Sequence, residues 1–242
     1  EQDTRHIQIQ VDCLVDRWSS ESLPYRAGDV VSILPYNSAD EVNAFLAVLP
    51  KKLQALADCE LEVVFDDESQ QVPGTGYPNW PTLCSLRGWL TYCADIHGLP
   101  EREDLRGLAP YSSLTHARGS DQCEKLMELS ETKGAALYAD YILREKRSWA
   151  DVFYDFDSLQ DAGSQLTLEA LFSLLPPIRP REFSIASSPT NDRLAKRNND
   201  TAFNLELCVA VVEGTTRLGR SFHGLCSHYL RNALQESSVC LW

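Results

Sequence analysis

The sequence predicts an α+β protein in which strand patterns near the two ends of the chain enclose a long helical stretch. Alternating or continuous apolar runs, which are typical of strands, occur at 6–14, 30–34 and 202–213. Between 37 and 175, apolar residues recur mainly at helical spacing. Separate runs of strands and helices favour the α+β class. The 242 residues suffice for one large domain or two small ones.

Composition and charge narrow the function classes. The chain has 22 Lys and Arg against 35 Asp and Glu, a net charge of −13, which argues against general nucleic-acid binding. Local arginines can still bind a dianionic cofactor. No apolar run approaches the roughly 18 residues of a membrane span, and the first residues lack the apolar core of a signal peptide. We therefore expect a soluble, cytoplasmic protein.

The eight cysteines predict neither a metal site nor a disulfide framework. They stand at positions 13, 59, 84, 93, 123, 208, 226 and 240, and none forms a Cys-x-x-Cys pair. Most have apolar neighbours. We therefore expect buried, reduced thiols.

The first strands and helix have clear local signals. Residues 6–14 alternate as a half-buried antiparallel strand does, and Gly28-Asp29 predicts a turn before a buried strand at 30–34. Ser38 and Glu41 predict a capping box. The apolar face of the helix that follows is expected to consist of Val42, Phe45, Leu46 and Leu49. A short strand at 61–65 and a loop at 66–80 come next.

Helical patterns then fill most of the chain up to the second strand region. They cover 82–96, 100–108, 121–131, 132–147, 149–156 and 167–175. Ordinary helix packing explains most of these residues without any function.

The stretch 178–189 carries the strongest chemical signal. On a strand, Arg181 and Phe183 point to one face, and Glu182 and Ser184 to the other. A guanidinium fork suits a diphosphate, and a neighbouring aromatic ring suits a flat heterocycle. The alternative is an ordinary strand with a surface arginine.

A second signal lies near the C-terminus. After a polar loop at 189–201 and a buried strand at 202–213, we expect a loop at 215–223 and a helix that begins after Gly224. A glycine before a helix lets backbone N–H groups approach a phosphate. Ser227 can cap this helix or bond a phosphate oxygen. A last strand begins at Val239.

These two motifs resemble the ferredoxin–NADP reductase superfamily, and within it the diflavin reductases. Arg181-x-Phe183-Ser184 with Ile-Ala-Ser-Ser after it is similar to the flavin-binding strand, and Gly224-Leu225-Cys226-Ser227 to the pyrophosphate loop, where Thr commonly stands at the position of Ser227. The resemblance implies that Arg181 and the loop hold the FAD pyrophosphate. It also implies that Phe183 stacks on the isoalloxazine, that Glu182 belongs to the FAD site, and that Ser184 lies near flavin N5 as the catalytic residue.

The basic run 144–147 adds a further candidate. It resembles a family run of the type Arg-Pro-Arg-Arg whose third position contacts FAD, and that position is Lys146. Lysine keeps the charge but loses bidentate geometry. Arg144 or Arg147 could substitute, and a solvated helix end is the alternative explanation.

The resemblance also implies an architecture. The expected fold is an antiparallel Greek-key β-barrel, a ferredoxin reductase-like FAD domain, formed by residues 1–36 and 166–242. A mainly helical connecting domain, residues 37–165, is inserted between the two parts of the barrel.

The implied function is electron transfer. Ile178-Arg179-Pro180-Arg181 with Phe183 is most similar to the NADPH-dependent diflavin oxidoreductases of cytosolic iron–sulfur assembly. In such an enzyme, electrons pass from NADPH through FAD and FMN to an iron–sulfur protein that resembles anamorsin. The chain lacks FMN and NADPH domains, so we expect a piece of a larger oxidoreductase, inactive alone. The alternatives are a cytochrome P450 reductase, a sulfite reductase flavoprotein, or an interaction module without flavin.

Overall fold

The computed structural model describes residues 2–11, 25–62, 83–188, 203–233 and 240–241. The chain divides into two compact units. The strand unit comprises Glu1–Pro35, Arg179–Glu213 and His223–Trp242, and the helical unit comprises Tyr36–Ile178 and Gly214–Phe222. No helix in the described parts is long and apolar enough to cross a membrane.

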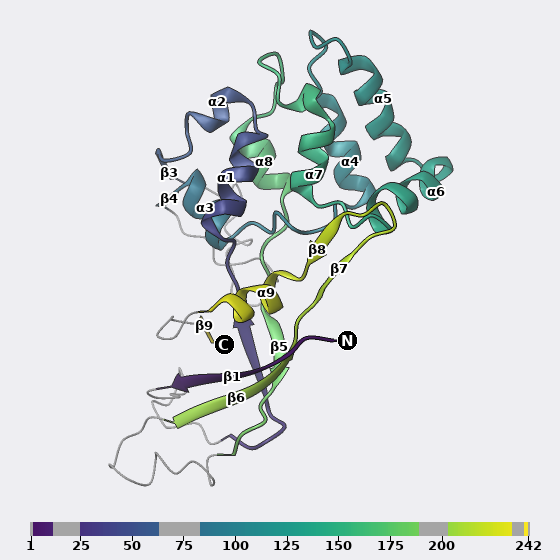
Figure 1. Cartoon of the computed structure of the whole chain (residues 1–242). Helices are drawn as coiled ribbons and strands as arrows, with labels where there is room; N and C mark the ends of the chain where they lie inside the picture. Colours follow the sequence, from purple (N-terminus) through teal and green to yellow (C-terminus); the bar gives the residue numbers. More distant parts are fainter. Residues whose placement is uncertain (1, 12–24, 63–82, 189–202, 234–239, 242) are drawn as a thin grey trace. The chain divides into compact units, whose positions relative to one another are not determined.

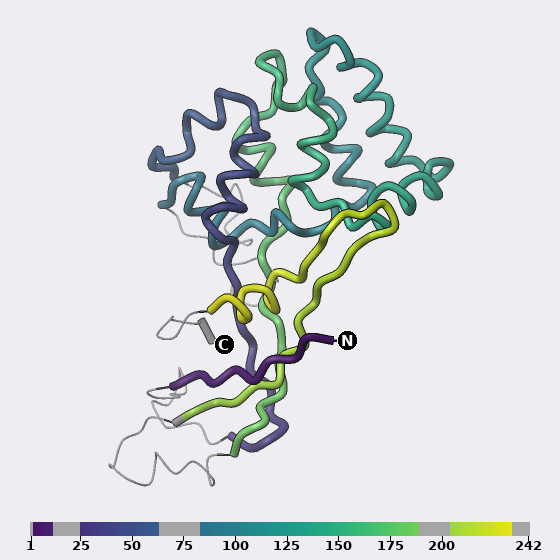
Figure 2. The backbone as a smooth tube through the Cα atoms, in the orientation of Figure 1, coloured from purple at the N-terminus to yellow at the C-terminus, as the bar shows by residue number. Residues whose placement is uncertain are grey.

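Antiparallel pairing organises the strand unit. Strand β1 (Thr4–Val11) pairs with β6 (Phe203–Ala210) along its whole length (Figure 1). Strand β2 (Val30–Leu34) lies between β5 (Arg181–Ser184) and β9 (Cys240–Leu241). An antiparallel bridge from Ile185 to Leu207 connects β5 to β6. The neighbouring strands therefore follow the order β1, β6, β5, β2, β9, and the backbone trace shows how distant segments meet here (Figure 2).

The apolar faces of these strands form the core of the strand unit. They pack together with one face of helix α9 (Leu225–Asn232). The buried residues include Val11, Tyr25, Val31, Ile33, Ile185, Leu205, Leu207, Val209, Cys226 and Leu230. The alternation predicted for 6–14 and 202–213 is confirmed over the described part of both strands. Residues 12–14 lie outside the described residues, as does the predicted loop at 189–201.

The α+β class is confirmed, whereas the closed barrel stays a prediction. In the parts of the chain that the structure describes, the strands form small sheets that do not close on themselves. The prediction that the cysteines are buried is wrong for Cys208 and Cys59, which are exposed. Cys208 alternates with the buried Leu207 and Val209 along β6, so the pleat directs its side chain outward.

Short helices around one apolar core make up most of the helical unit. The helices are α1 (Ala39–Ala47), α2 (Lys51–Gln54), α3 (Leu86–Tyr92), α4 (Arg102–Leu108), α5 (Gly119–Ser130), α6 (Ala135–Tyr138), α7 (Trp149–Asp155) and α8 (Leu168–Leu174). Short 3-10 turns occur at Ala109–Tyr111, Thr132–Gly134 and Asp157–Leu159. The largest buried side chains include Phe45, Trp89, Trp149 and Phe153. The rings of Phe45 and Phe153 meet edge to face, with 5.5 Å between their centroids.

The capping box predicted for the first helix is confirmed. The Ser38 amide donates to Glu41 Oε2 at 2.7 Å, and the Glu41 amide donates to Ser38 Oγ at 3.3 Å. The predicted apolar face is buried: Val42, Phe45, Leu46 and Leu49.

Residues 83–85 differ from the prediction. Leu83–Ser85 forms strand β4, which pairs with β3 (Glu60–Glu62), whereas the sequence pattern predicted a helix from 82. Ser85 Oγ accepts the Gly88 amide at 3.0 Å, so the helix cannot begin before Leu86. The rest of the predicted 61–65 strand, and the loop at 66–80, lie outside the described residues.

Two further segments also differ. The helical pattern predicted over 132–147 breaks into a 3-10 turn, the short α6 and a π-helix at Ala139–Leu143. The segment predicted as a loop at 215–223 is a hairpin of β7 (Glu213–Thr215) and β8 (Ser221–His223). Gly219 has φ +82° at its tip, a conformation that glycine adopts without a side-chain clash.

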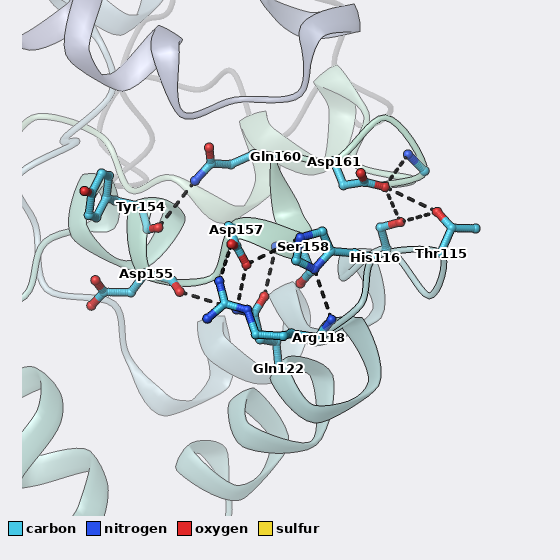
Figure 3. Close-up of polar contacts among 12 residues, drawn as sticks. Thr115, His116, Arg118, Gln122, Tyr154, Asp155, Asp157, Ser158, Gln160 and Asp161 are labelled. Atoms are coloured by element: carbon cyan, nitrogen blue, oxygen red, sulfur yellow. Dashed lines mark hydrogen bonds and ion pairs between the residues drawn. The ribbon is translucent and has the colours of Figure 1, made fainter.

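A polar network connects two loops of the helical unit (Figure 3). Asp161 Oδ1 accepts from Ser113 Oγ at 2.6 Å and from the Gly163 amide at 2.9 Å. These hydrogen bonds lower the pKa of Asp161. Gln122 extends the network, since it donates to Asp157 Oδ1 at 2.9 Å and accepts the Ser158 amide at 2.9 Å. The network serves the fold, because these hydrogen-bonding groups satisfy one another.

Candidate functional site

Strand β5 places the four residues of the first motif. Its register pairs Arg181 with Ile33 and Phe183 with Val31. Directly paired residues share a face of a sheet, so Arg181 and Phe183 lie on the face of buried residues. Glu182 and Ser184 are exposed on the opposite face.

Arg181 has no acidic partner among the described residues. Its guanidinium is exposed, and Nη1 makes only long contacts of 3.4 Å to the carbonyl oxygens of Arg179 and Pro180. An arginine that is not neutralised by a carboxylate retains its donors for an external anion.

Phe183 and Ser184 differ in burial as the pleat requires. The Phe183 ring is partly buried and packs against the core of the strand unit. Ser184 is paired with Val30, which is 56% exposed. Phe183 therefore offers a ring that the core holds in place, and Ser184 offers a hydroxyl on an open face.

The loop before α9 allows close approach of the backbone. Gly224 is the N-cap of α9, and its amide donates to the Val212 carbonyl at 2.7 Å. A Cβ at Gly224 would lie 3.0 Å from Val212 Cβ and 3.2 Å from Ser227 Oγ, which is tighter than ordinary contact. The amides of the next residues, Leu225 and Cys226, belong to the first helical turn and have no acceptor within the helix. Together with the positive end of the helix dipole, these two amides favour the binding of an anion at this end of α9.

Ser227 occupies the third helical position and is not the N-cap. Its Oγ accepts the Val212 amide at 3.0 Å and donates to the Gly224 carbonyl at 3.2 Å. Only 7% of the residue is exposed. The hydroxyl is therefore occupied within the protein.

Cys226 shows that the first turn of α9 lies close to β2, at the residue that pairs with Arg181 of β5. Its thiol is buried, with Sγ 4.0 Å from the Ile33 carbonyl oxygen. Burial raises the pKa of Cys226 to about 11, although the nearby positive charge of Arg181 acts in the opposite direction. The structure thus brings Arg181 to the same end of the strand unit as the free amides of α9.

Lys146 lies in the helical unit, in the turn that follows the π-helix. It is exposed and has φ +48°, in the left-handed region. Arg144 pairs with Asp140, and Arg147 pairs with Asp155. The Arg147 guanidinium also lies over the Tyr141 ring, 4.4 Å from its centroid. Within the described residues, Lys146 is the member of the basic run without an ion pair.

Sequence reasoning missed the contacts that support these segments. Arg231, in the last turn of α9, pairs with Glu213 at the start of β7. Glu145 is 4% exposed and accepts Thr216 Oγ1 at 2.7 Å. These partners are 18 and 71 residues apart, so no local pattern could indicate them.

Comparison with known families identifies the class of protein as one with an FAD binding domain. Residues 5–229 match the model of the FAD binding domain family, and the chain belongs to this family. Over 230 residues it is 33% identical to NADPH-dependent diflavin oxidoreductase 1 of Mus musculus. This alignment covers 95% of this chain and 33% of the mouse protein. The protein of the same name from Eremothecium gossypii is 32% identical over 228 residues, 91% of this chain and 33% of that protein.

The protein of the same name from Danio rerio is 30% identical over 229 residues, 95% of this chain and 33% of that protein. The resemblance to diflavin oxidoreductases expected from the motifs is thus confirmed. The chain spans about a third of the length of these relatives.

Proposed function

We propose that this chain binds one FAD and forms the FAD-binding and connecting region of an NADPH-dependent diflavin oxidoreductase. The observation that carries the proposal is the position of Arg181. It has no acidic partner among the described residues, and it pairs with Ile33, whose carbonyl oxygen contacts Cys226 in the first turn of α9. A guanidinium and free helix N-terminal amides in one place are the donors that a diphosphate requires.

The residues present fit the cofactor. Gly224 leaves space that a side chain would fill, so the backbone can approach a pyrophosphate. The Arg181 fork and the backbone amides of Leu225, Cys226 and Ser227 would hold its oxygens. Bound FAD would supply the capacity to accept a hydride and to release electrons singly.

The remaining β5 residues would orient the flavin ring. Phe183, which the core holds, would cover one face of the isoalloxazine, and the exposed Ser184 hydroxyl would donate a hydrogen bond near N5 and serve as the catalytic group. Glu182 is a carboxylate that would repel phosphate. We therefore propose that its side chain or backbone contacts a hydroxyl group of the cofactor, away from the pyrophosphate.

Lys146 is the proposed cofactor contact of the basic run. Arg144 and Arg147 are each paired with an aspartate, whereas Lys146 has no ion pair in the described part of the helical unit. A cation without a carboxylate neighbour is the member of the run that can neutralise a phosphate.

The finer assignments are proposals that extend the family membership. We propose that residues 1–36 and 166–242 complete an antiparallel Greek-key barrel and that 37–165 form the connecting domain. The relatives' name, NADPH-dependent diflavin oxidoreductase 1, supports NADPH as the electron donor and the presence of a second flavin. We propose that the second flavin is FMN and that further domains of a longer cytoplasmic protein bind FMN and NADPH. We propose an anamorsin-like iron–sulfur protein as the electron acceptor.

FAD titration of the purified chain tests the proposal, followed by flavin absorbance near roughly 450 nm. We expect saturable one-to-one binding. Arg181→Ala should weaken it by about 2 kcal/mol, roughly 30-fold, the cost of a lost charge-assisted contact. Arg5→Ala is the matched control, because Arg5 lies on β1 and pairs with Asp3. A folded chain that binds no FAD would overturn the proposal in favour of an interaction module without flavin.

A further inference from the structure

We propose that the Ser227 side chain is a positioning group for the loop before α9 and does not itself bind the cofactor phosphate. The inference rests on the proposed function, because it concerns which groups at this loop contact FAD. Serine at this position suggests a phosphate ligand from sequence alone. The hydrogen bonds of the structure assign it another role.

The donor capacity of Ser227 is already used. A serine hydroxyl has one O–H donor and two lone pairs, whereas a phosphate oxygen without a proton can only accept. Ser227 Oγ lies 3.2 Å from the Gly224 carbonyl oxygen, which requires the donor, and 3.0 Å from the Val212 amide, which occupies a lone pair. Only 7% of the residue is exposed, and its single O–H donor is already used, so Ser227 has no donor left for a phosphate.

Two hydrogen bonds of Val212 attach the loop before α9 to the segment that follows β6. Val212 donates its amide to Ser227, and its carbonyl oxygen accepts the Gly224 amide at 2.7 Å. Both backbone groups of Val212 therefore fix the first turn of α9. The ion pair of Arg231 with Glu213 holds the last turn of α9 to the next residue of the same segment.

This attachment determines where the free amides point. Gly224 is held by its amide, which donates to the Val212 carbonyl, and by its carbonyl, which accepts from Ser227 Oγ, so its position sets that of the Leu225 and Cys226 amides. Preorganised donors bind an anion more tightly than donors that must be ordered on binding. Ser227 would thus contribute to FAD affinity through the backbone amides, its own included.

The two possible roles differ before any ligand is added. If Ser227 positions the loop, removal of its hydroxyl leaves the Val212 amide without its acceptor in the ligand-free chain, whereas the Gly224 carbonyl keeps the His228 amide as a donor. If Ser227 were only a ligand, the ligand-free chain would be unchanged. Hydrogen exchange at the Val212 amide therefore separates the roles.

The experiment compares Ser227→Ala with the wild-type chain in two measurements. We expect exchange of the Val212 amide to become at least about tenfold faster without ligand, and FAD affinity to fall about tenfold. Ser227→Cys, which retains a weak donor of similar size, is measured beside it and should show smaller effects in both. Ser221→Ala is the matched control, because Ser221 is exposed on β8.

Three results would be decisive against the inference or its basis. Weaker FAD binding with unchanged Val212 exchange identifies Ser227 as a direct ligand. Faster exchange with unchanged FAD affinity reduces its role to fold stability. Arg181→Ala is titrated in parallel, and unaltered FAD affinity in that variant refutes the proposed function itself, whatever happens at Val212.

Discussion

The left-handed backbone conformation of Lys146 can be tested by the sign of the stability difference between two variants. Lys146→Ala and Lys146→Gly both remove the charge and differ only in backbone freedom. At φ +48° a residue with a Cβ loses roughly 1–2 kcal/mol, whereas glycine adopts this conformation freely but costs about 0.5–1 kcal/mol in chain entropy. We therefore expect the glycine variant to be more stable than the alanine variant by about 0.5–1 kcal/mol.

Urea denaturation followed by circular dichroism and tryptophan fluorescence measures this difference, with equal m-values as the condition for comparison. At an ordinary helical position the order would be reversed, with glycine about 1 kcal/mol less stable than alanine. A glycine variant less stable than the alanine variant would therefore refute the left-handed conformation. In FAD titrations both variants should bind equally, and more weakly than wild type, if Lys146 acts through its charge.

Three further perturbations test other parts of the structure. Gly224→Ala should cost about 1–3 kcal/mol of stability by overpacking against Val212 and should weaken FAD binding, and unchanged values in denaturation and titration would exclude the close approach. Leu207→Ala, at a fully buried position in β6, should lower the free energy of unfolding by about 2–5 kcal/mol, and a cost below about 1 kcal/mol would contradict its place in the core. Burial alone would raise the pKa of Asp151, but hydrogen bonds from Arg220 and Ser148 lower it overall, so its stabilising effect is present above the unfolded-state pKa of about 3.9 and is lost as the pH falls through the folded-state pKa. Urea midpoints of Asp151→Asn should therefore fall less than those of wild type between about pH 5 and 3, and parallel curves would show that Asp151 does not contribute.

The local signals in the sequence predicted the elements that depend on local physics. The capping box at Ser38 and Glu41 formed as expected, because side-chain spacing specifies it. The strand at Val30–Leu34 also formed, but the prediction that it is buried is wrong for Val30, which is exposed. The hairpin at 213–223 was missed because its partners lie elsewhere: Thr216 bonds to Glu145, 71 residues earlier in the chain. Leu83–Ser85 was misassigned for a similar reason, since pairing with β3 outweighed its apolar spacing.

The candidate site divides in the same way. The identities and facing of Arg181 and Phe183 were predictable from a motif on one strand, and the register with β2 agrees with it. The role of Ser227 was not predictable, because it depends on where the backbone of Val212 lies. Sequence indicates which chemical groups are available, and tertiary contacts decide which of them are already occupied.

The hairpin residues Gly214–Phe222 belong to the helical unit although both flanking segments belong to the strand unit. During synthesis, the buried Glu145 therefore lacks its partner Thr216 until a further 71 residues have been made. A truncated polypeptide that stops at Ile178 would lack that partner and the Arg220 partner of Asp151. Anyone who wishes to express the helical unit separately has to graft the nine residues 214–222 back onto it.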